Sequence, residues 1–405
     1  MNALNTRKAF AGGLLALAVA SAAHAMEIKA DCTVPFTPET AILGHFSSTK
    51  EPVATVKSGA IVRIDGGGGV RYGGGELTEE TMDAWLKENG IDATVATTPA
   101  LAETMKVLKE TKNRLPPPPN APPGTPAAGG HLLVGPVYIE DAEPGDSLEV
   151  RILDVTPRIP YGSTSGSPGR GGLSLGMSAP ESFESASKAL PLTPPAPSVP
   201  RPFSKVTLLD LKRNAGHFDK DIEIPLGPFM GVMATCPPDS EGPNRRSTAP
   251  GTFGGNLDCK ELVAGSTLYL PVYQKGALFY TGDSHAVQGD GEVTGSAIET
   301  ADTCTLQFIL HKGQKLAMPR AETPTDYILF GLDPDLNKAM KQAIEETLGF
   351  LKEKQGLDIF HAYSLSSIAV DYHVTQVVDR VLGVHAMVPK KIFVNDTNTY
   401  WYRAR

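Results

Sequence analysis

The sequence is poor in several features that mark common classes of protein. Its 405 residues include only 4 cysteines and 2 tryptophans, and 37 Lys and Arg stand against 45 Asp and Glu, for a net charge of −8 at pH 7. A nucleic-acid-binding protein needs a basic surface to meet phosphates, so this acidic balance argues against such a partner. No apolar run after residue 25 is long enough to span a membrane, so we expect no membrane association of the remaining chain.

Familiar enzyme signatures are also absent. The chain has no P-loop, no His-Glu-x-x-His and no Gly-x-Ser-x-Gly between a strand and a helix. The glycine run at residues 66–69 lacks the acidic partner of a dinucleotide fingerprint, so a dinucleotide site is not expected. Any catalytic site must therefore rest on another constellation of residues.

Glycine and proline are abundant, with 41 and 34 residues, and 41% of the chain is hydrophobic. That combination is typical of many short strands joined by turns. Apolar periodicity predicts two short helices at about 80–88 and 100–112 and a long C-terminal helix with Asp333 as N-cap, Pro334 at its first position and an end near Gly356. We predict a mostly β protein of the α+β class, with a sandwich or barrel body, peripheral helices and a long C-terminal helix.

The first 25 residues have the layout of a secretory signal peptide. Arg7 and Lys8 precede an apolar run of about a dozen residues, which is too short for a transmembrane helix, and Ala23-His24-Ala25 is a small-x-small cleavage pattern. We predict a signal peptide over residues 1–25 and a periplasmic or secreted mature protein that begins at Met26.

Residues 26–405 are interpreted as one catalytic domain with two additions. Residues 66–130 combine the two short helices with a proline-rich linker, and we predict an insertion that loops out of the β body. Residues 161–202 are rich in Gly, Ser and Pro, and we predict a flexible loop or active-site flap. Exposed strand edges favour self-association, so a homo-oligomer is expected.

Four cysteines lie in the predicted mature chain, at Cys32, Cys236, Cys259 and Cys304. Export would permit disulfides, and four cysteines allow three pairings among which the sequence does not choose. No C-x-x-C spacing is present, so a zinc site built from thiolates is not expected. We interpret the cysteines as structural, with at most one disulfide.

Residues with metal-binding side chains gather between residues 254 and 292. Asp283 and His285 stand two apart, so on an extended strand both side chains point to one face, as two ligands of one metal ion would. Asp258 can complete the set from a neighbouring strand, and Glu292 can act as another ligand or as a base. The alternative is that the carboxylates are turn residues and His285 is only hydrogen-bonded. The oxygen and nitrogen ligands favour zinc, with calcium and manganese as alternatives.

Several separated blocks, in order, resemble the acetamidase/formamidase family. The string GDSHAVQGDGE at residues 282–292 carries the resemblance, preceded by GGNLD at 254–258 and LYLPV at 268–272. The blocks HLLVGPVYIE at 131–140, EPGDSLEV at 143–150 and GPFMG at 227–231 agree with it. So do Ala362-Tyr363, the TQVVD at 375–379 and the VPK at 388–390 near the C-terminus.

The resemblance implies a metal-dependent amidohydrolase that cleaves the C–N bond of small amides such as acetamide or formamide and releases ammonia. It places Asp258, Asp283 and His285 as metal ligands, with His131, Glu140, Asn256 and Glu292 around the site. Either Glu140 or Glu292 serves as the base that takes the proton of water and passes it to the leaving nitrogen. Either His131 or the Asn256 amide donates to the developing oxyanion.

Two other functions remain open from the sequence. One is a periplasmic binding protein that keeps the fold and the metal without turnover. The other is hydrolysis of a urea- or guanidine-like compound at the same site. In addition, the 66–130 insertion and the 161–202 loop are expected to reshape the substrate entrance, which favours an amide larger than acetamide.

Overall fold

The computed structural model describes residues 28–70, 77–115, 130–166, 171–172, 203–395 and 400–402. The predicted signal peptide lies outside these residues, as do residues 116–129 of the proline-rich linker and most of the predicted flap. Within the described ranges, no helix combines the length and the apolar character needed to cross a membrane.

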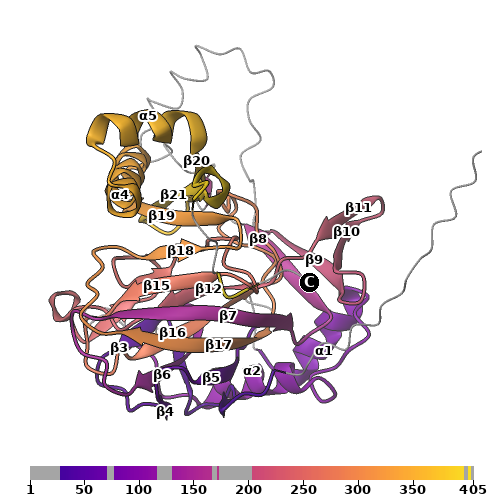
Figure 1. Ribbon diagram of the computed structural model, residues 1–405. Coiled ribbons are helices and arrows are strands. Elements are labelled where there is room, and N and C mark those ends of the chain that lie inside the picture. The colour runs from indigo at the N-terminus through magenta and orange to yellow at the C-terminus, as the bar shows by residue number, and fades with distance from the viewer. Residues whose placement is uncertain are drawn as a thin grey trace, which may run out of the picture.

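Two large sheets form the body of the described chain (Figure 1). The first has nine strands, in the spatial order β1 (Cys32–Val34), β5 (Ile61–Asp65), β17 (Asp302–His311), β7 (Ser147–Pro157), β15 (Thr267–Pro271), β18 (Arg320–Glu322), β19 (Asp326–Asp333), β21 (Leu382–Pro389) and β20 (Asp371–Gln376). The second has the order β14 (Gly254–Asn256), β12 (Phe229–Ala234), β16 (Phe279–His285), β6 (Leu132–Ile139) and β2 (Ala41–Leu43), with β4 (Ala54–Val56) parallel to β6.

The main hydrophobic core lies between these two sheets. Val62 and Ile64 of β5, and Leu306 and Phe308 of β17, stand two apart on their strands and are fully buried in it. Phe279 comes from the other sheet, and its ring meets that of Phe308 edge to face at 4.9 Å. Burying one such side chain contributes about 1.5–3 kcal/mol. The mostly β sandwich predicted from composition is therefore confirmed.

Two smaller sheets complete the strand structure. β8 (Tyr161–Gly166), β9 (Phe203–Asp210), β10 (Ala215–Asp219) and β11 (Ile222–Pro225) form an antiparallel meander, and β3 (His45–Ser47) pairs with β13 (Asn244–Arg246). Residues 161–166 are thus a strand and not the start of a loop, because their backbone pairs with β9 from Tyr161↔Leu208 to Gly166↔Phe203.

Helices occur at both places predicted between residues 66 and 130. α1 (Glu79–Glu88) begins with a capping box at Thr78 and Thr81, and α2 (Pro99–Glu110) has proline at its first turn. Their buried faces form a second core together with Ile159 and Tyr161 of the body. This segment therefore packs against the sandwich and does not stand away from it.

The long C-terminal helix is α4 (Leu336–Gln355), followed by α5 (Ile359–Ala369); both lie at one end of the molecule against β19 and β21 (Figure 1). The Asp335 side chain, and not that of Asp333, caps α4 by accepting from the Asn337 amide. Asp333 still belongs to β19, which delays the helix start. Gly356 ends α4 in the left-handed conformation, as predicted.

All four cysteines are free, so the single disulfide that the sequence allowed does not form. Cys236, Cys259 and Cys304 are buried.

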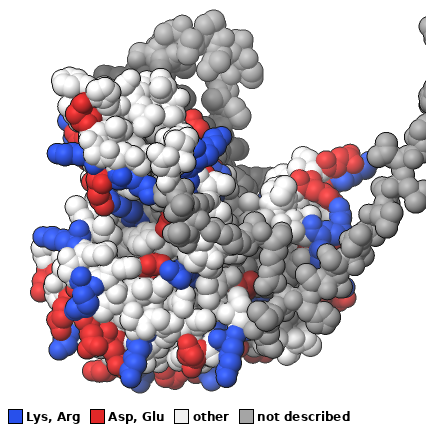
Figure 2. All heavy atoms as spheres, in the orientation of Figure 1, with Lys and Arg blue, Asp and Glu red and all other residues white. Residues whose placement is uncertain are grey.

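The surface carries both signs of charge. On the face in Figure 2, Lys and Arg are interspersed with Asp and Glu, and the residues drawn in colour there form no broad basic stripe.

Candidate active site

A cavity of about 770 Å³ opens beside the last residues of β14 and β16 and the first residue of β6. Five of the residues singled out from the sequence line it: His131, Asn256, Asp258, Asp283 and Glu292. Gly67–Gly69 and Trp85 line the same cavity, so the segment that carries α1 contributes to its wall.

Asp283 and His285 meet as predicted, but not through a regular strand. Asp283 has a φ of +61°, a conformation that is uncommon for a residue with a side chain. Its Oδ2 lies 3.5 Å from His285 Nε2 and 3.9 Å from His131 Nε2. Burial disfavours the charged carboxylate, but the two histidines outweigh it and hold the pKa of Asp283 below its ordinary value.

Gly231 on β12 provides the space in which these side chains converge. A Cβ atom at this position would lie 2.4 Å from Asp258 Oδ1 and 2.8 Å from both Asp283 Oδ2 and His285 Cε1. Only glycine leaves room for three ligand groups against the β12 backbone. Sequence reasoning did not assign Gly231 to the site, although it ends the GPFMG block at 227–231.

Three carboxyl groups lie together beside this cluster. Asp258, Glu292 and Asp379 offer ligand atoms within 4.8 Å of one another. Burial and the neighbouring Glu292 raise the pKa of Asp258, and burial together with Asp379 raises the pKa of Glu292 well above its ordinary value. Burial raises the pKa of Asp379 to about 6. Such a concentration of buried acid is stabilised by protons or by a bound cation.

Asp258 and Asp283 line the cavity, His285 lies against Asp283, and the ligand atoms of the three residues fit a metal ion. Asp258 Oδ1 and both ring nitrogens of His285 are buried without a hydrogen-bond partner. Asp258, Asp283 and His285 place one ligand atom each within 4.8 Å of the others, and His285 forms a second such group with Glu292 and Glu299. Burial disfavours protonation of His285, but Glu299 and Asp283 raise its pKa well above the ordinary value, so the site attracts positive charge.

His131 and Asn256 line the wall of the cavity, and each has a polar side-chain atom that makes no hydrogen bond. His131 Nδ1 has no hydrogen-bond partner, and the side chain is about one-fifth exposed. Asn256 Nδ2 donates to the Thr248 carbonyl at 3.2 Å, while its Oδ1 accepts nothing. Asn256 therefore offers a fixed acceptor, and His131 offers a ring nitrogen that makes no hydrogen bond.

Glu140 is not in the site, which contradicts its prediction as a base. It follows the last residue of β6, whereas His131 precedes the first, and the eight residues between them span roughly 26 Å. The Glu140 amide instead donates to the Val56 carbonyl beside β4. Glu140 and His131 belong to one motif, but they stand at opposite ends of β6.

Replacing Gly231 by Ala is expected to displace the ligands and to lower kcat/KM by roughly 10²-fold or more, because ångström-scale misplacement costs that much. Gly289→Ala is the matched control, since a Cβ there meets nothing within 4 Å and the backbone φ is not positive. Bound metal, turnover and Tm would be measured for both variants. Equal behaviour of the two variants would show that Gly231 has no steric role.

Comparisons with known proteins agree with this architecture. A family model described as the Acetamidase/Formamidase family matches residues 230–395. The formamidase of Methylophilus methylotrophus is 30% identical over 323 residues, which cover 66% of this chain and 78% of that enzyme. The chain belongs to the acetamidase/formamidase family. Membership confirms the enzyme class predicted from the sequence, an amidohydrolase that acts on C–N bonds other than peptide bonds.

Other members of the family resemble the chain over shorter or more divergent stretches. The acetamidase of Mycolicibacterium smegmatis is 30% identical over 220 residues, 45% of this chain and 54% of that one. The acetamidase structure from Bacillus halodurans superposes with a TM-score of 0.66 at 24% identity, covering 89% of this chain and 98% of the other. The acetamidase structure from Yersinia enterocolitica superposes with a TM-score of 0.64 at 22% identity, covering 89% of this chain and 92% of the other. These structures establish the shared fold.

Proposed function

We propose that this family member hydrolyses the C–N bond of an amide in the cavity, in a metal-dependent reaction that yields a carboxylate and ammonia. The observation that carries the proposal is the set of buried ligand atoms of Asp258 and His285 that make no hydrogen bond and lie beside Asp283. A binding protein would have no need to keep a further buried carboxylic acid, Glu292, beside them.

Asp258, Asp283 and His285 would hold the metal, for which zinc suits the ligand set best and calcium or manganese are the alternatives. When bound, a divalent cation polarises the amide carbonyl and lowers the pKa of water. Two functions remain for the other polar residues that line the cavity: proton transfer and orientation of the amide.

Glu292 is the residue that we assign to proton transfer. Its carboxyl group lines the cavity and is buried, and its pKa is raised by burial and by Asp379, which makes it able to hold a proton between two steps. It takes the proton of the attacking water and gives it to the nitrogen, which must be protonated to leave as ammonia.

Asn256 and His131 are assigned to orientation of the substrate. The unpaired Oδ1 of Asn256 accepts from an amide N–H, because its own Nδ2 is already bound to Thr248. His131 donates to the carbonyl oxygen, where negative charge develops during attack. The two side chains therefore distinguish the two ends of an amide group.

The cavity is far larger than formamide or acetamide requires, and Trp85 and Phe203 give it apolar walls. We propose that the preferred substrate is an amide with an apolar or aromatic substituent. Ammonia release from a size series of amides should show kcat/KM rising with the substituent. Trp85→Ala should lower it about 10- to 100-fold for the largest amides, from lost apolar burial, and leave formamide unchanged.

Trp401→Ala is the matched control for this experiment, because that second tryptophan binds Thr267 Oγ1 and does not line the cavity. A Trp85→Ala variant that loses activity equally on all amides would contradict the size argument. Ammonia from urea but from no amide would favour the urea-type alternative. No turnover of any compound by a metal-loaded protein would favour the binding protein.

A further inference from the structure

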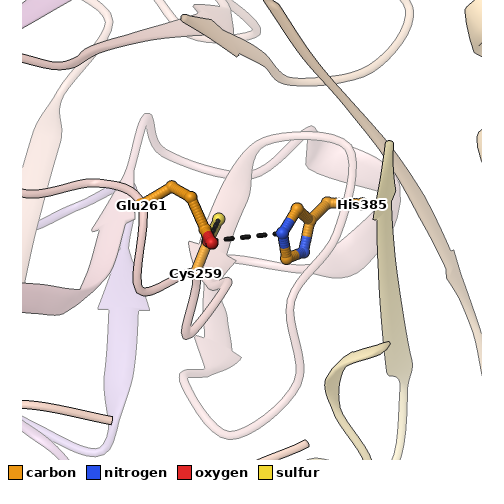
Figure 3. Close-up of side chains that lie close together, drawn as sticks. All are labelled: Cys259, Glu261 and His385. Atoms are coloured by element: carbon orange, nitrogen blue, oxygen red, sulfur yellow. Dashed lines mark hydrogen bonds and ion pairs between the residues drawn. The ribbon is translucent and has the colours of Figure 1, made fainter. Parts of the chain in front are cut away.

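We propose that Cys259, Glu261 and His385 form a second metal site, outside the cavity, that binds Zn²⁺ structurally. Cys259 and Glu261 lie on the loop that follows β14, and His385 lies on β21 of the other large sheet (Figure 3). Their chemistry is that of a zinc site, a thiolate, a carboxylate and an imidazole.

Two of the three ligand separations match those around a tetrahedral ion, and the third is within 4.8 Å. Glu261 Oε2 lies 3.3 Å from Cys259 Sγ and 3.2 Å from His385 Nε2, and the three ligand atoms all lie within 4.8 Å of one another. Zinc held at about 2.3 Å from sulfur and about 2.0 Å from nitrogen and oxygen separates its ligands by roughly 3.3–3.5 Å. The three side chains therefore need little movement to bind it.

The orientation of His385 points to a ligand. Its side chain is fully buried, and Nδ1 is joined to Thr375 Oγ1 at 2.8 Å, which fixes the ring. Nε2 then faces Glu261 without an aligned hydrogen bond. A zinc-binding histidine usually holds the metal on one ring nitrogen and a hydrogen-bond partner on the other, and Thr375 takes the second place here.

The neighbours of Glu261 leave one of its oxygens for the ion. Lys260 Nζ lies 2.6 Å from Glu261 Oε1 and 2.7 Å from Asp290 Oδ2, so Oε2 is the oxygen left toward Cys259 and His385. Asp290 also belongs, with His373, to a group of ligand atoms that shares His385. Asp290 or a water molecule would fill the fourth position.

A nucleophilic role for Cys259 fits the geometry less well. In a nucleophilic triad the imidazole stands between the thiol and the carboxylate. Here the Glu261 carboxylate stands between Cys259 and His385. Cys259 is fully buried in the main core and does not line the cavity, so no substrate reaches it.

The site would tie the loop of one sheet to a strand of the other. Asp258, the proposed ligand in the cavity, directly precedes Cys259 and has a φ of +48°. Zinc bound by Cys259 and His385 would fix the backbone next to Asp258 and so stabilise its left-handed conformation. The second site is thus structural, with an effect on the first through the backbone.

Cobalt substitution tests the proposal, because a thiolate ligand gives Co²⁺ a near-ultraviolet charge-transfer band that oxygen and nitrogen ligands do not give. Wild-type protein should show this band, and Cys259→Ser should lose it together with one equivalent of zinc. Cys304→Ser, which removes another fully buried cysteine, should keep the band. Asp283→Asn should keep it too, so failure of the cavity site and failure of this site are distinguishable.

A second variant covers the case in which Cys259→Ser does not fold. Thr375→Val preserves shape but removes the partner of His385, and it should weaken cobalt binding at the thiolate site about 10- to 100-fold. No band in the wild type, a band that persists in Cys259→Ser, or unchanged affinity in Thr375→Val would each overturn the proposal.

Discussion

Asp283→Asn is expected to remove the bound metal and amide hydrolysis together, with kcat/KM lower by about 10²–10³-fold or more. The Asp283 carboxylate lies between His285 and His131, and its charge is the ligand property that an amide lacks. Asparagine has the same shape and tolerates a positive φ, so the fold should persist. Metal content by mass spectrometry and ammonia release would be measured on the same preparation.

Asp141→Asn is the matched control. Asp141 also has a positive φ, of +63°, but it lies in the turn after β6, far from the cavity. Its substitution should change neither metal content nor turnover. An Asp283→Asn protein that kept both would show that Asp283 is not a ligand.

Glu292→Gln is expected to lower kcat by about 10²–10⁴-fold while the metal stays bound, because glutamine cannot accept and return a proton. The substitution preserves the size of a side chain that is only 8% exposed, so packing should survive. Steady-state ammonia release, with metal content measured in parallel, separates loss of proton transfer from loss of the ion.

Glu140→Gln is the control. Glu140 lies at the end of β6 opposite to His131 and the cavity, so this substitution should leave turnover and metal content unchanged. Turnover that survived Glu292→Gln would exclude Glu292 as the base. Loss of the metal in that variant would instead make Glu292 a ligand, as its grouping with His285 and Glu299 allows.

Local sequence patterns predict the fold class, the helices and one group of site residues. Abundant turn residues indicated the β body, and apolar periodicity located α1, α2 and α4. The spacing of Asp283 and His285, with Asp258 from a nearby strand, predicted a group of side chains that the structure brings together.

The remainder depends on long-range geometry. Glu140 and His131 belong to one motif, but the extended strand β6 separates the two residues by its full length. Asp379 enters the site from a distant part of the chain, and Gly231 matters only because three side chains converge on it. The left-handed backbone at Asp283 is likewise imposed by tertiary structure.

The central claim is that the cavity hydrolyses an amide with the help of a bound cation. Its most direct test is ammonia release from a panel of amides by purified protein, as isolated, after chelation, and after return of zinc, calcium or manganese singly. We expect activity as isolated, loss on chelation and recovery with one cation, zinc first. Hydrolysis that persisted in fully metal-free protein would contradict the account.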